Sequence, residues 1–275
     1  MRAVGIHLMP DMTRDDPPER SAVAEIGPTG DLLGVQMCSS NGEIAATVGT
    51  SPALVMIDAP VVIPPDTSGR RDLEHVLAWL DIPAFPVTPA RMVTVHGGAR
   101  GAILAALLPP AQIVVEGIPD QVIRQLLWER DHPPGSEPLG LAAYRAAWLD
   151  VRPPAFRPRG GRARNDGLAP AREILGDATD LGAWPEPERL GDLAALDEAS
   201  AIDATACAVT AYRCLYGDDD GWARIGSTDR GVVIIPADPD LIARAEVNIA
   251  RLAHEGTIAI PLEVAGRAVG PPQSW

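Results

Sequence analysis

Apolar segments of strand length, separated by polar turns, open the chain. Residues 2–9 (RAVGIHLM), 21–26 (SAVAEI) and 32–38 (LLGVQMC) are rich in apolar and β-branched side chains. The segment GPTGD between the second and third holds the Gly and Pro residues typical of a tight turn. We therefore predict three consecutive strands that form an antiparallel meander at the N-terminus.

Two later apolar runs are typical of central strands that are buried on both faces. Residues 53–57 (ALVMI) and 112–115 (QIVV) each end at an acid, Asp58 after the first and Glu116 after the second. Residues 232–235 predict a late strand, and residues 257–264 are a candidate last one. Helical patterning covers residues 41–48, 73–80, 102–108, 119–128, 198–215 and 241–254, and the alanine-dense segment 198–215 is the clearest.

This order of elements predicts an α/β domain with a mixed sheet. The antiparallel meander lies at one edge, parallel strands follow, and helices flank the sheet. We expect residues 1–275 to form a single domain, because no long polar linker divides the chain. Residues 131–192 are rich in Pro, Gly and Arg and predict an insertion outside the sheet with two short helices. Residues 237–275 predict a C-terminal extension.

Composition limits the expected binding partners and the expected cellular compartment of the protein. The formal net charge is −14, a field that repels long nucleic acid unless basic residues are concentrated locally. The three cysteines show no CxxC spacing, so we expect neither a zinc site nor a disulfide framework, and a reducing cytoplasm fits. The longest apolar stretch, residues 102–115, is interrupted by Pro109 and Pro110 and is too short to span a bilayer. We therefore expect a cytoplasmic protein without a membrane segment.

Five segments, taken in order, resemble a family of predicted RNase H-like nucleases known as domain of unknown function 429. They are IDAP with GRRDLEHVL (57–60 and 69–77), VEGIPDQVIRQL (115–126), GGRAR (160–164), IDATACAVTAYRCL (202–215) and GVVIIP (231–236). The resemblance implies an RNase H-like α/β fold. One position departs from the family, which usually begins GxDxA with an Asp on the first strand. Here Gly5 and Ile6 are followed by His7.

The resemblance also implies a chemistry. RNase H-like nucleases hold two divalent cations, Mg²⁺ or Mn²⁺, between carboxylates from the first strand, a central strand and a late helix. On that basis Asp58, Glu116 and Asp203 are candidate catalytic residues and metal ligands, with His7 as an atypical ligand. The implied partner is a nucleic acid. The resemblance does not distinguish DNA, RNA and small phosphoesters, and the oligomeric state stays open.

Each candidate has a structural alternative. Asp58 is a metal ligand or a turn residue that hydrogen-bonds its own backbone. Asp203 is a ligand or a solvated acid on a helix surface. Glu116 is a ligand or the ion-pair partner of a nearby Arg, and His7 is a ligand or a core histidine whose polar atoms are satisfied.

A local excess of arginine interrupts the acidic chain. Six arginines lie between Arg145 and Arg164 against a single acid, Asp150. Guanidinium groups bind phosphate in a bidentate manner, so this segment predicts a site for the substrate backbone. The candidate substrate-binding residues are Arg157, Arg159, Arg162 and Arg164. The alternative is a solvated Pro-rich loop whose arginines pair with surface acids.

Two hypotheses of function follow. The first is a metal-dependent nuclease or phosphodiesterase, in which His7 weakens a site that normally has an acid on the first strand. The second is a non-catalytic RNase H-like module that binds nucleic acid or protein and has lost its metal centre. The substitution at His7 favours the second hypothesis, and restoring Asp there would discriminate between them.

Overall fold

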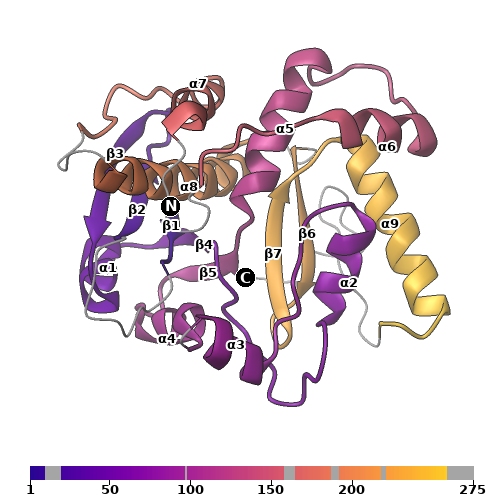
Figure 1. Cartoon of the computed structure of the whole chain (residues 1–275), viewed down its shortest axis with the longest axis horizontal. Coiled ribbons are helices and arrows are strands. Elements are labelled where there is room, and N and C mark those ends of the chain that lie inside the picture. Colours follow the sequence, from indigo (N-terminus) through magenta and orange to yellow (C-terminus); the bar gives the residue numbers. More distant parts are fainter. Residues whose placement is uncertain (10–19, 97, 158–164, 187–191, 218–220, 259–275) are drawn as a thin grey trace.

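A seven-stranded mixed sheet forms the centre of the molecule, in the order β3-β2-β1-β4-β5-β7-β6 (Figure 1). The computed structural model describes residues 1–9, 20–96, 98–157, 165–186, 192–217 and 221–258. The strands are β1 (Arg2–His7), β2 (Ser21–Ile26), β3 (Leu32–Cys38), β4 (Ala53–Ile57), β5 (Ile113–Glu116), β6 (Trp222–Ser227) and β7 (Gly231–Pro236). Strands β1, β4, β5 and β7 run parallel, and β2, β3 and β6 extend the sheet in antiparallel pairs.

Helices cover both faces of the sheet (Figure 1). The α-helices are α1 (Asn41–Val48), α2 (Asp72–Trp79), α3 (Pro89–His96), α4 (Arg100–Leu107), α5 (Pro119–Asp131), α6 (Leu141–Asp150), α7 (Leu168–Gly176), α8 (Asp192–Tyr216) and α9 (Pro239–His254), with a short 3₁₀ turn at Asn165–Gly167. On one face of the sheet, helices α5, α7 and α8 pack against the strands in a single apolar cluster. On the other face, α1 and α4 pack over β1 and β4, and α2 and α9 pack over β6 and β7.

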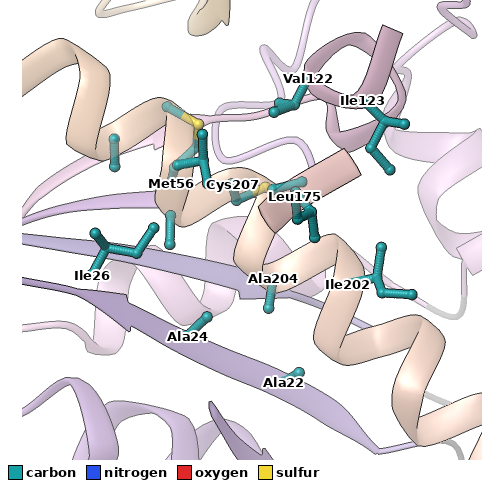
Figure 2. Close-up of a cluster of buried hydrophobic side chains, with 14 of the residues drawn as sticks. Ala22, Ala24, Ile26, Met56, Val122, Ile123, Leu175, Ile202, Ala204 and Cys207 are labelled. Atoms are coloured by element: carbon teal, nitrogen blue, oxygen red, sulfur yellow. The ribbon is translucent and has the colours of Figure 1, made fainter. Parts of the chain in front are cut away.

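Small residues bring helix α8 close to the first three strands. A Cβ atom at Gly5 of β1 would overlap the backbone of Ala204 and Ala208 on α8, so glycine is required for this approach. Figure 2 shows Ala22 and Ala24 of β2 on the side of the sheet that faces α8. The alanine-rich composition of α8 thus reflects close packing on the sheet as well as helix propensity.

Most predicted elements are present. The meander, the buried strands β4 and β5, the late strand β7 and the predicted helices lie where the pattern placed them, within a few residues at their ends. Within residues 131–192, the described part forms α6 and α7, which are not part of the seven-stranded sheet, and Asp180 makes an isolated parallel bridge with Asp31. Helix α8 begins at Asp192 rather than at residue 198, so Asp203 lies near its middle. Beyond Ile258, the candidate strand at 257–264 falls outside the described residues.

Two elements were not predicted, β6 and α3. Strand β6 carries Arg224 and Gly226 in a short edge segment, which lacks a continuous apolar run. Helix α3 is mostly exposed, with only Met92 buried among residues 89–94, so it lacks the apolar stripe by which the other helices were recognised. Among the described helices, none combines the length and apolar character needed to cross a bilayer.

Candidate functional site

Three predicted residues converge where β1 and β4 end. These strands are parallel and in register up to Ile6 and Ile57, so His7 and Asp58 follow side by side. Side chains alternate between the faces of a sheet, and Ile6 and Ile57 point toward α1 and α4. His7 and Asp58 therefore turn toward the face covered by α8, where Asp203 meets them.

The donor atoms of this cluster lie close together. His7 Nδ1 is hydrogen-bonded to Asp58 Oδ2, and it lies 3.6 Å from Asp203 Oδ2. The other Asp58 oxygen accepts the backbone N–H of Leu8 at 2.8 Å. One ligand atom from each of His7, Asp58 and Asp203 lies within 4.8 Å of the others. The cluster can thus hold a metal ion, although its geometry does not identify which one.

Burial perturbs the titration of the cluster. Asp203 is 1% exposed, and this burial raises the pKa of its carboxyl group, while Arg157 and His7 oppose the rise. Burial also acts to lower the pKa of His7, but the neighbouring carboxylates of Asp58 and Asp203 outweigh it, so the pKa of His7 is raised. Without a metal ion, the imidazole therefore favours its protonated form more than an ordinary histidine does.

Arg157 joins the cluster from the Pro-rich segment that follows α6. Its Nε donates to Asp203 Oδ2 at 2.7 Å, its Nη2 donates to Asp203 Oδ1, and its Nη1 donates to Asp120 Oδ1. The guanidinium also lies over the ring of Phe156, 4.8 Å from the centroid. One third of the Arg157 side chain stays exposed to solvent.

Arg157 is the one candidate substrate-binding arginine that falls within the described residues. Arg159, Arg162 and Arg164 lie outside the described residues. Arg145 pairs with Asp81 on the surface. For Arg145, this pairing agrees with the alternative in which the arginines of the segment pair with surface acids. Arg157, in contrast, lies beside the candidate metal ligands.

Glu116 is the ion-pair partner of Arg71 rather than a neighbour of the metal cluster. Arg71 donates to both oxygens of Glu116 at 2.7 Å, and its Nε donates to Glu74 at 2.7 Å. All three side chains are buried. In the parallel register Glu116 pairs with Ile57, one residue before Asp58, so it points to the opposite face of the sheet. The structure therefore does not bring Glu116 to His7, Asp58 and Asp203.

Sequence reasoning missed Arg71, Glu74 and Asp120. Arg71 precedes helix α2 and donates its backbone N–H and its Nε to the carboxylate of Glu74 three residues later, a spacing that was available in the sequence. Asp120 stands in the first turn of α5, where an acid is favourable to the helix dipole. Neither pattern by itself points to a cleft, which explains why both were overlooked.

A cleft of about 740 Å³ opens at the carboxyl ends of β1, β4 and β5. Its lining includes the polar residues His7, Asp58, Asp120 and Arg157 and also the Arg71–Glu116 pair. Most of the remaining wall is apolar. Part of it comes from α2, the segment after it and α3, and the rest comes mainly from the residues that follow β1, β4 and β5 and from the start of α4. Ligands of open α/β sheets bind at the carboxyl ends of the strands, and this cleft has that position.

Comparisons with known proteins return no relative. No family model, no curated protein and no solved structure matches the chain. What the site does is therefore inferred from the contacts of His7, Asp58, Asp203 and Arg157 themselves.

Proposed function

We propose that this chain is a metal-dependent phosphodiesterase with an RNase H-like fold. The observation that carries the proposal is the convergence of His7, Asp58 and Asp203 beside Arg157 at a cleft. An antiparallel meander followed by parallel strands supports the fold assignment. The three residues come from the first strand, a central strand and a late helix, as the resemblance to RNase H-like nucleases implies.

The donor set suits Mn²⁺ better than Mg²⁺. Two carboxylates satisfy either ion, but the imidazole of His7 favours the softer one. Donor atoms around a six-coordinate ion at about 2.1 Å lie at most about 4.2 Å apart. The cluster spans up to 4.8 Å, so small side-chain movements would close it around an ion.

We propose a single cation for this site rather than two. Among the described residues, the only cluster able to hold an ion is His7, Asp58 and Asp203. The guanidinium of Arg157 lies between Asp203 and Asp120, and it supplies positive charge where a second cation would otherwise bridge carboxylates. Arg157 thus takes the part of a fixed cation.

The proposed reaction is hydrolysis of a phosphodiester. A bound divalent cation would polarise the phosphoester and a water molecule. The water oxygen forms a bond to phosphorus, the ester P–O bond breaks, and the leaving oxygen takes up a proton. Arg157 uses three N–H groups on Asp203 and Asp120, which leaves two to hold a phosphate oxygen.

Calorimetric titration with Mn²⁺ and with Mg²⁺ tests the metal centre. We expect one Mn²⁺ per chain in the wild type, weaker binding of Mg²⁺, and loss of both in Asp58→Ala. Asp66→Ala is the matched control, because Asp66 is an exposed acid paired with Arg230 away from the cleft. Absence of binding in the wild type, or equal binding in Asp58→Ala, would overturn the proposal. Hydrolysis of bis-p-nitrophenyl phosphate then tests the reaction.

One observation favours the non-catalytic alternative. Ion pairs already balance two of the three negative charges here without a metal ion, since a protonated His7 pairs with Asp58 and Arg157 pairs with Asp203 and Asp120. An RNase H-like module that has replaced its metal by these ion pairs would bind a partner without hydrolysing it. His7→Asp discriminates between the two functions, because a gain of metal binding from none marks a lost centre. In the phosphodiesterase, the wild type already binds the ion.

A further inference from the structure

The apolar wall of the cleft is not explained by phosphodiester hydrolysis alone. Leu73 and Leu77 of α2, Val87 after it and Met92 of α3 are buried and line the cleft. Phe85 is 43% exposed and lies in the same lining. A site that only gripped a phosphate backbone would need cationic and polar walls rather than these side chains.

The size of the cleft fits one small molecule. A volume of about 740 Å³ lies within the range of roughly 300–1,000 Å³ that holds drug-sized ligands. Asp58 and Arg157 line the same cleft as the apolar residues, so a ligand whose phosphate reached them would place its substituent against the apolar wall. A phenylalanine ring and a methionine thioether both pack well against aromatic groups.

The charges around the cleft limit the charge of that ligand. Three arginines line it, Arg71, Arg100 and Arg157, against the carboxylates of Asp58, Glu74, Glu116 and Asp120, with Asp203 beside the cluster. One divalent cation brings these described groups to neutrality, so the site has no excess positive charge to hold a polyanion, and a single phosphate charge would be held locally by the cation and Arg157. The net charge of −14 over the whole chain disfavours a polynucleotide further.

We propose that the cleft binds a small phosphodiester monoanion that carries one aromatic ester group, with the ring seated on Phe85 and Met92. This inference rests on the proposed phosphodiesterase function, and it assigns the substrate class of the same site. A polynucleotide is the competing occupant.

Two phosphonate monoesters test the ring seat, because they carry the same single charge and resist hydrolysis of their P–C bonds. Methyl phenylphosphonate carries the ring, and methyl methylphosphonate lacks it. We expect the phenyl compound to bind roughly tenfold more tightly or better, which is the effect of burying one ring. Calorimetry measures both compounds on the Mn²⁺-loaded chain and again with the metal chelated.

Variants then locate the ring. Phe85→Ser and Met92→Gln should each remove most of the preference for the phenyl compound while leaving Mn²⁺ binding intact. Leu107→Ser is the control, because Leu107 is 54% exposed on α4 and does not line the cleft. Phe85→Ser changes an exposed side chain, so loss of folding does not confuse its result.

The outcomes separate this inference from the function on which it rests. A ring preference that depends on Phe85 and Met92 supports the inference, and it does so even if Mn²⁺ fails to bind, a result that would overturn only the phosphodiesterase. Equal binding of the two phosphonates, or no binding of either, overturns the ring seat. A ten-nucleotide DNA strand that binds more tightly than the phenyl compound overturns the small-molecule assignment.

Discussion

Side-chain alternation along a strand decides which acids meet at this site. Asp58 and Glu116 both follow apolar strands, and in the sequence they look equivalent. The parallel register pairs Glu116 with Ile57, so the two acids point to opposite faces of the sheet. One acid joins His7 and Asp203, and the other neutralises Arg71. A one-residue difference in register between the two acids thus separates a candidate ligand from a structural ion pair.

Removing Arg71 should strongly destabilise the fold. Arg71→Met leaves the buried carboxylates of Glu74 and Glu116 without their partner, at an expected loss of roughly 3–5 kcal/mol in the free energy of unfolding. Urea denaturation at pH 8 measures this loss. The deficit should shrink at pH 5, because unpaired buried carboxylates gain protons more readily.

Arg230→Met is the matched control for Arg71→Met. Its ion pair with Asp66 is exposed, so the loss should stay within about 1 kcal/mol. A similar loss in both variants would show that the buried ion pairs of Arg71 contribute no more to the free energy of unfolding than an exposed pair does.

At the residue scale, the sequence could identify the members of the site but not all of their contacts. Asp58 follows a buried strand, and His7 stands where the resemblance expects an acid, so both were found. The pairing of Arg71 with Glu116 joins residues 45 positions apart. Propensity and periodicity carry no signal for such a contact, because it depends on where α2 packs relative to β5.

At the scale of elements, the approach of α8 to β1 places Asp203. Gly5→Ala would force the helix away from the strand, because the added methyl group meets the backbone of Ala204 and Ala208. We expect a loss of roughly 1–3 kcal/mol in the free energy of unfolding. Mn²⁺ binding should weaken as well, since Asp203 would move away from His7 and Asp58. Denaturation and calorimetry on the same sample check both effects.

Gly34→Ala is the matched control for Gly5→Ala. Gly34 lies in the edge strand β3, and an added Cβ would meet nothing within 4 Å. Stability should change by no more than about 0.5 kcal/mol, and Mn²⁺ binding should not change. If both substitutions had equal effects, close packing of α8 would not be what positions Asp203.

Asp81 connects three helices and should contribute to stability only above acidic pH. It follows α2 and accepts hydrogen bonds from Arg145 of α6 and Arg244 of α9. Burial acts to raise the pKa of Asp81, but these arginines outweigh it, so its pKa is lowered from the ordinary value of 3.8. The folded state therefore gains stability above pH 3.8, and the gain is lost as the pH falls through the lower folded pKa.

Asp81→Asn tests this dependence on pH. Asparagine tolerates the positive φ of 57° at this position and removes only the charge. The variant should be less stable than the wild type at pH 7, and the difference should vanish toward pH 2. Denaturation curves at several pH values measure it. A difference that stays constant with pH would contradict the assignment.

The order of the elements could be predicted because most strands have a clear signal in the sequence. Residues 53–57 are apolar throughout and 21–26 lie between turn signals, so their strands were found with their correct ends. Strand β6 escaped because an edge strand needs no continuous apolar run, and its pairing with β7 supplies what its composition lacks. The start of α8 was placed too late, because the pattern was judged by its alanine-dense half.

For the whole molecule, the net charge should give the affinity for Mn²⁺ and the affinity for an anionic ligand opposite dependences on salt concentration. The field of −14 charges attracts a divalent cation and repels an anion. Because salt screens both effects, Mn²⁺ affinity should fall several-fold between about 0.01 and 0.3 M NaCl. The affinity for methyl phenylphosphonate should hold or rise. Calorimetry at both salt concentrations checks the signs, and a phosphonate affinity that falls steeply with salt would point to a cationic site instead.

The close packing of Gly5 beneath α8 also has a consequence for motion. Strand β1 pairs on both edges and is covered on both faces, so its amide protons should exchange with solvent deuterium only when the whole domain opens. Helix α3, with Val93 67% exposed, should exchange through local opening on a faster timescale. The cleft would then have a rigid wall at β1 and a wall at α3 that opens locally. Ligands would enter past α3. The positions of His7, Asp58 and Asp203 would remain fixed, while the apolar side of the cleft adjusts to the shape of the ligand.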